Sequence, residues 1–145
     1  MKRLFLALAL TAITVSVLTA GCLEENGGNG TPTSVQWVSY GTALEQAETT
    51  GTPVMVDFYA DWCGPCQQMD ETTYKNRQVI QQIADSFTAV KVNVDQRQDL
   101  ATQYNIRSIP TIVYLNENGS EIHRTVGYRS ASQLMDDMDR ALQKT

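Results

Sequence analysis

Basic residues and cysteines are both scarce in this chain of 145 residues. The 11 Lys and Arg are outnumbered by 16 Asp and Glu, and no Arg- or Lys-rich stripe is present. Because binding to nucleic acid depends on clustered cations, this composition argues against nucleic acid as a partner. Three cysteines are too few for a small domain held together by disulfides. The length and the 42% hydrophobic content fit one globular domain plus a short targeting or linker segment.

The longest apolar run lies at the N-terminus. Lys2 and Arg3 precede Leu4 to Ala20, a stretch without a charged residue. A basic start, an apolar segment and small residues before a cleavage site describe an export signal. The run falls slightly short of the roughly 20 residues of a membrane-spanning helix. We therefore predict that residues 1–21 are a signal peptide and that the body of the protein lies outside the cytoplasm.

The residues that end this run predict a lipid anchor. Ala20-Gly21-Cys22 resembles the lipobox of prokaryotic lipoproteins, in which the cysteine is lipidated and becomes the new N-terminus, although Thr19 stands where that motif usually has Leu. The alternatives are an ordinary cleaved signal and an uncleaved signal anchor. Residues 22–34 are rich in Gly, Asn, Thr and Pro and predict a flexible tether to a membrane. The domain then covers residues 35–145.

The body of the chain alternates between strand-like and helix-like patterns. Residues 54–60 form an apolar run around one acid, Asp57, which is typical of a strand buried on both faces. The order of elements predicts an α/β fold with a mixed central sheet flanked by helices. The predicted strands are residues 35–38, 54–60, 87–94, 111–115 and 121–126. The predicted helices are residues 40–49, 63–86 with a break near Lys75-Asn76, 98–104, and a last one capped by Ser130.

Two cysteines stand where the buried strand passes into a helix. At a helix N-terminus, unpaired N–H groups and the macrodipole stabilise the Cys63 thiolate, which is the attacking species. Two intervening residues bring Cys66 within one helical turn, close enough to attack a mixed disulfide on Cys63. Gly64 limits steric cover over the sulfur, and Pro65 suits an early helical position that needs no N–H partner. This pattern predicts thiol–disulfide exchange.

Two motifs resemble those of the thioredoxin family. The stretch Val56 to Cys66 resembles the family's active-site signature, and Ile109-Pro110-Thr111 resembles its second signature, in which the proline is cis. The resemblance covers roughly residues 35–143 and implies the thioredoxin fold.

The resemblance also implies roles for single residues. Cys63 matches the exposed nucleophile and Cys66 the buried resolving thiol. Asp57 matches a buried acid that helps to move the proton of the resolving thiol, and Lys91 matches the lysine that accompanies it. No cofactor is implied beyond the Cys63–Cys66 pair. The implied substrate-docking residues are Trp62, Gly64, Pro65, Ile109, Pro110 and Gly127.

The predicted function is reduction of disulfides in exported proteins by a monomer. The Gly-Pro pair between the cysteines and Ile109 before the proline resemble reducing thioredoxins. Residues 37–47 and 69–79 look more like the thioredoxin-like domains of exported thiol reductases such as the C-terminal domain of DsbD. Because no nucleotide or flavin motif is present, electrons must come from a membrane thiol transporter.

Several alternatives stay open at this stage. A disulfide oxidase or isomerase uses the same cysteines, and a non-catalytic adaptor uses the fold only as a docking surface. A structural Cys63–Cys66 disulfide is disfavoured because its small loop constrains little of the unfolded chain. A zinc site is disfavoured because only His123 and Cys22 remain as further nitrogen or sulfur ligands. We predict that His123 is a solvated surface residue, and we predict no metal.

Overall fold

The computed structural model describes residues 30–145, and the predicted signal peptide, Cys22 and most of the predicted tether lie outside them. Five strands form one sheet in the order β1-β3-β2-β4-β5. β1, β3 and β2 are parallel, and β4 and β5 join antiparallel to them, which confirms the predicted mixed sheet. The strands are β1 Trp37–Val38, β2 Val54–Tyr59, β3 Thr88–Asn93, β4 Thr111–Leu115 and β5 Glu121–Val126.

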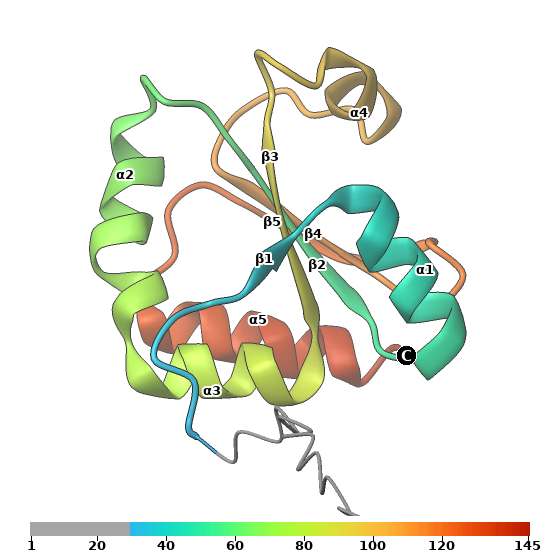
Figure 1. Ribbon diagram of the computed structural model, residues 1–145. Coiled ribbons are helices and arrows are strands. Elements are labelled where there is room, and N and C mark those ends of the chain that lie inside the picture. The colour runs from blue at the N-terminus through green and yellow to red at the C-terminus, as the bar shows by residue number, and fades with distance from the viewer. Residues whose placement is uncertain (1–29) are drawn as a thin grey trace, which may run out of the picture.

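Helices cover both faces of this sheet (Figure 1). α1 and α4 pack on one face, and α3 and α5 pack on the other together with the end of α2. Among the described residues, no helix is both long and apolar enough to cross a membrane. The helices are α1 Tyr40–Thr50, α2 Gly64–Glu71, the 3₁₀ helix η1 Thr73–Lys75, α3 Arg77–Ser86, α4 Gln98–Gln103 and α5 Ala131–Leu142.

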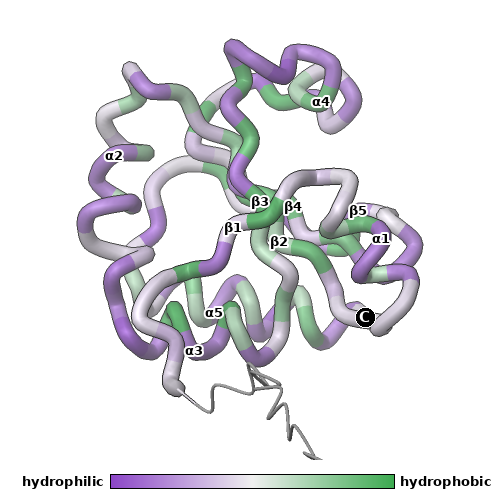
Figure 2. Tube along the Cα trace, viewed as in Figure 1, coloured by the Kyte–Doolittle hydropathy of each residue, from purple (hydrophilic) through white to green (hydrophobic). Residues whose placement is uncertain are grey.

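Alternation along the central strand divides the core into two. Val54, Val56 and Phe58 of β2 face α1 and α4, whereas Met55 faces α3 and α5. Figure 2 shows the hydrophobic colouring concentrated on the central strands and the hydrophilic colouring on the loops and outer helical turns. β2 is therefore buried on both faces, as its sequence predicts, and Asp57 is buried within it.

Local hydrogen bonds explain where the helices begin. The Asn76 side chain accepts hydrogen bonds from the backbone of Gln78 and Val79, so α3 starts at Arg77 and the helix predicted for residues 63–86 is broken here, as expected. Ser130 forms a capping box with Gln133 and starts α5. β3 is slightly shorter than the predicted strand at residues 87–94 because Phe87 ends α3.

Candidate active site

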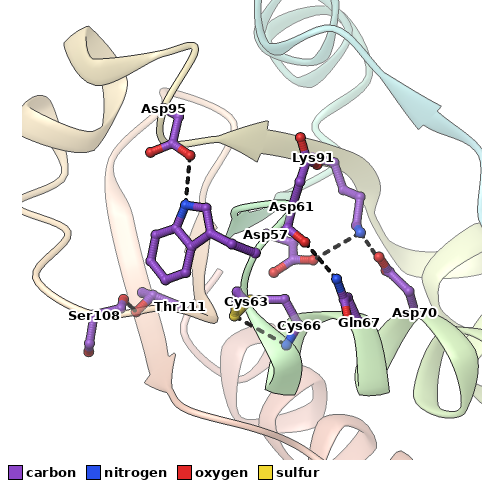
Figure 3. The surroundings of a disulfide bond; sticks show 11 residues. Asp57, Asp61, Cys63, Cys66, Gln67, Asp70, Lys91, Asp95, Ser108 and Thr111 are labelled. Carbon is purple, nitrogen blue, oxygen red and sulfur yellow. Dashed lines mark hydrogen bonds and ion pairs between the residues drawn. A yellow bond between two sulfur atoms is a disulfide. The ribbon is translucent and has the colours of Figure 1, made fainter.

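The two cysteines lie at the carboxyl end of β2, where the chain turns into α2. Cys63 is the N-cap of α2, and its Sγ accepts a hydrogen bond from the backbone N–H of Cys66 at 3.3 Å (Figure 3). Pro65 occupies the first turn, where a missing N–H costs no helical hydrogen bond. Cys63 and Cys66 form a disulfide with a Cα–Cα distance of 5.2 Å. Helix geometry therefore places the two sulfurs within reach of each other and directs the N-terminal N–H groups at Cys63.

The disulfide is more deeply buried than the resemblance implied. Cys66 is 3% exposed, as expected for a resolving thiol, but Cys63 is only 4% exposed, so its predicted exposure is wrong for the oxidised protein. Tyr59, Val94 and Ile109 pack against the cysteine pair. These contacts come from three segments that sequence patterns do not bring together. A partner thiolate therefore reaches Cys63 along a restricted approach rather than across an open surface.

The large exposed side chain beside the disulfide is Trp62. Its indole is 71% exposed, and its Nε1 donates a hydrogen bond to Asp95 at 2.8 Å. Trp62 and Ile109 line a pocket of about 180 Å³ together with Arg107. A rigid aromatic wall next to a small apolar hollow fits an extended peptide segment carrying an apolar side chain. The docking role of Trp62 stays a prediction, and its position is consistent with that role.

The loop opposite the cysteines contains the second motif. The Ile109–Pro110 peptide bond is cis, which confirms the isomer that the resemblance implied. The Pro110 carbonyl accepts a hydrogen bond from Gly127 N–H at 2.8 Å, so these two predicted docking residues lie side by side. Gly127 has a φ of 88°, a conformation that side chains other than glycine rarely adopt. Gly64 is exposed beside Cys63. The docking role of these residues stays a prediction.

A buried acid and a lysine lie beneath the cysteines. The parallel register of β2 and β3 pairs Asp57 with Lys91, and Lys91 Nζ lies 3.9 Å from Asp57 Oδ2. Burial raises the pKa of Asp57 to about 7, against the lowering effects of Lys91 and the Tyr74 hydroxyl. Within residues 30–145, Asp57 Oδ1 has no hydrogen-bond partner. A carboxyl that binds its proton near neutral pH is suited to accept and return the proton of a thiol.

Two further polar residues at this site were not singled out from the sequence. Asp70 follows Cys66 by four positions on α2, and the Lys91 ammonium donates a hydrogen bond to Asp70 Oδ1 (Figure 3). Tyr74 is buried in η1, and its hydroxyl faces Asp57. The helical spacing of Cys66 and Asp70 was a usable signal. No local pattern indicated Tyr74, because η1 reaches Asp57 only through tertiary packing.

The prediction that His123 is a solvated surface residue is wrong. The ring stacks on Tyr114 with centroids 5.6 Å apart, and its Nε2 lies 3.9 Å from Asp137 of α5. Desolvation lowers the pKa of His123, so burial favours the neutral ring. The histidine is covered because α5 packs over β5, a contact between distant segments. Among residues 30–145, no group of three or more His, Cys, Asp or Glu side chains is arranged to hold a metal ion.

Comparison with known proteins shows similarity to thioredoxins. The family model described as Thioredoxin matches residues 35–140. Thioredoxin 1 of Synechococcus elongatus is 34% identical over 105 residues, which are 72% of this chain and 94% of that protein. A thioredoxin-like protein of Synechocystis is 42% identical over 86 residues, which are 59% of this chain and 78% of that protein.

Solved structures extend this similarity. A thioredoxin from Thermus thermophilus superposes with a TM-score of 0.68 and 29% identity, covering 75% of this chain and 88% of that one. The DsbH oxidoreductase superposes with a TM-score of 0.69 at 21% identity, covering 79% and 89% of the two chains. At that identity the second likeness shows the fold alone. The first is a thioredoxin by its description and agrees with the family model.

Proposed function

This chain belongs to the thioredoxin family, and we propose that it reduces disulfide bonds in exported proteins from a lipid-anchored position outside the cytoplasm. The observation that carries the proposal is the Cys63–Cys66 pair at the start of α2, with Asp57 buried beneath it. The redox-active pair needs no cofactor of its own. The location, the anchor and the reductive direction go beyond the family assignment and rest on the sequence features described above.

The proposed reaction begins with the reduced protein. The Cys63 thiolate attacks one sulfur of a substrate disulfide, a mixed disulfide forms, and the other substrate sulfur leaves as a thiolate that takes up a proton. Cys66 then gives its proton to Asp57 and attacks the Cys63 sulfur. The second substrate thiolate leaves and is protonated, and the Cys63–Cys66 disulfide remains. The substrate has gained two electrons and two protons. The protein has lost two electrons and the Cys66 proton, which Asp57 passes on, and the other proton comes from solvent, which took up the Cys63 proton when its thiolate formed.

The direction of exchange depends on the reduction potential of the pair. The Gly64-Pro65 sequence between the cysteines and the thioredoxin relatives above 30% identity favour a reductant. We expect a value near that of thioredoxin, about −270 mV. A potential above about −180 mV would instead assign the protein to the oxidases or isomerases.

The partners follow from the proposed location. A signal peptide over residues 1–21 and lipidation at Cys22 would hold the domain at a membrane of the cell envelope through the segment 22–34. The proposed substrates are exported proteins that contain disulfides. To act repeatedly, the oxidised protein must receive two electrons by dithiol exchange, and we propose a membrane thiol-electron transporter as the donor. We expect the protein to act as a monomer.

Trapping of substrates tests the proposal. A Cys66→Ala variant keeps the nucleophile but cannot release a captured substrate, so it should accumulate mixed disulfides in cells. The matched control, Cys63→Ser, should trap nothing and should lose insulin-disulfide reduction. We expect the captured proteins to be exported ones. Capture of cytoplasmic proteins alone would contradict the location, and normal cellular function of Cys63→Ser would indicate an adaptor.

A further inference from the structure

Three charged side chains form a line from the buried acid to the protein surface. The side chains of Asp57, Lys91 and Asp70 are 3%, 16% and 43% exposed, respectively. Lys91 donates its hydrogen bond to Asp70, whereas its Nζ remains 3.9 Å from Asp57 (Figure 3). The lysine is therefore hydrogen-bonded to the outer acid, whereas its ion pair with the inner acid is longer.

Aromatic rings surround the Lys91 ammonium. Its Nζ lies 4.3 Å from the ring centroid of Tyr59, 5.5 Å from that of Trp37 and 5.7 Å from that of Tyr74. Trp37 and Tyr74 themselves meet edge to face at 5.1 Å. Trp37 and Tyr59 are both partly exposed and pack beside this charge. The rings hold the ammonium by cation–π attraction and limit where it can move.

Asp70, the most exposed of the three charged residues, borders a pocket on the surface. Asp70, Lys91, Trp37 and Tyr74 line this pocket of about 330 Å³, together with Lys75 of η1. None of these residues lines the Trp62–Ile109 pocket where a substrate segment is expected. The ion pair can therefore stay in contact with solvent while a substrate covers the disulfide.

We propose that Asp70 is a positioning residue for the exchange reaction, because it draws Lys91 away from Asp57 and so prevents the lysine from holding Asp57 as a permanent carboxylate. The inference rests on the proposed function, in which Asp57 must both accept and return a proton. Within residues 30–145, Asp57 is the other acid that forms an ion pair with Lys91, so it is the partner left to the ammonium when Asp70 is replaced.

The electrostatics around Asp57 agree with this role. The groups that face it are Lys91 from β3, Tyr74 from η1, Asp70 from α2 and Tyr114 from β4. Burial is the main cause of its raised pKa, and the Asp70 charge acts in the same direction, whereas Lys91 and the Tyr74 hydroxyl lower it. A general base works best when its pKa is near the working pH. If the Lys91 ammonium moved closer to Asp57, it would lower the pKa of Asp57 further.

Titration of Asp57 in the oxidised protein tests the proposal, because the bonded cysteines do not titrate there. The ¹³C signal of the Asp57 carboxyl is followed against pH in the wild type, D70N and E71Q. Glu71 neighbours Asp70 on α2, carries the same charge and is exposed, so E71Q is the matched control. We expect the midpoint of Asp57 to fall by about one pH unit in D70N. It should change by less than about 0.3 in E71Q.

A kinetic readout separates positioning from a structural role. The acid limb of the pH profile for disulfide reduction should move with the Asp57 midpoint in D70N, and D70N should have no effect on the profile in a D57N background. Equal midpoints in D70N and E71Q, or a higher midpoint in D70N, would overturn the proposal. If D70N fails to fold, D70S provides the same comparison. If the wild type reduces no disulfide, the proposed function fails, but the titration still decides the role of Asp70.

Discussion

Two buried aspartates lie on the side of the sheet that α3 and α5 cover, and their surroundings differ sharply. Asp137 of α5 is 5% exposed, and it accepts hydrogen bonds from Arg129 Nε at 2.8 Å and from Arg140 at 3.0 Å, one on each oxygen. Asp57 is buried to the same degree, but its nearest cation is 3.9 Å away and bonded elsewhere. Within residues 30–145, one of its oxygens has no partner.

This difference indicates a structural role for Asp137 and a role in proton transfer for Asp57. A buried carboxylate with two guanidinium partners has both oxygens hydrogen-bonded and fixes the segments that supply them. A buried carboxyl with incomplete pairing has a raised pKa and exchanges a proton near neutral pH, as Asp57 does at about 7. Incomplete pairing lowers the stability of the folded protein, and the residue responsible lies at the site where the thiol chemistry is expected.

The largest effect is expected for D57N in the oxidised protein. Because burial raises the folded pKa of Asp57 from 3.8 to about 7, the folded state binds more protons than the unfolded state between these values. The stability of the wild type therefore falls through this group as pH rises from about 4 to 7, and D57N lacks that loss. We expect the advantage of D57N in unfolding free energy to grow by about 4 kcal/mol between pH 4 and pH 8. Urea unfolding measures it, and a constant difference would contradict the assignment.

D137N is expected to destabilise the protein, and its effect on the unfolding free energy should be smaller than that of D57N. The substitution removes the charge that Arg129 and Arg140 share and leaves the partly buried Arg129 without its acid. We expect a loss of about 2 kcal/mol in unfolding free energy at pH 7. The exposed neighbour D136N is the matched control and should change little. Equal stability of D137N and the wild type would show that the two aspartates do not differ as described.

The smallest effect is expected for R140A. The Arg140 side chain is 60% exposed, so its pair with Asp137 is screened by solvent, and Arg129 still pairs with the acid. We expect R140A to lower the unfolding free energy by less than about 1 kcal/mol, and less in 1 M salt. R129A should have the larger effect, because Arg129 is only 26% exposed. The reverse order in thermal or urea unfolding would be inconsistent with the observed burial.

The sequence predicted the parts of the site that depend on local geometry or on motifs. The strand at residues 54–60, the helix that follows Cys63 and the break before Arg77 can be recognised from periodicity and capping residues. The cis bond before Pro110 followed from the family motif. The exposure of Cys63 and the solvation of His123 were predicted wrongly, because both depend on segments that are distant in the chain.

The sequence by itself determined the cysteine pair. Two residues separate Cys63 from Cys66, so a helix that starts there places the two sulfurs on the same side of its first turn, within reach of each other. What only the tertiary structure decided is the environment of Asp57. The register of β2 and β3 places Lys91 opposite it, and the packing of α2 and η1 adds Asp70 and Tyr74. The pKa of Asp57 depends on burial and on charges supplied by several segments that are distant in the chain. A local sequence pattern cannot show how these segments pack, so it cannot predict that pKa.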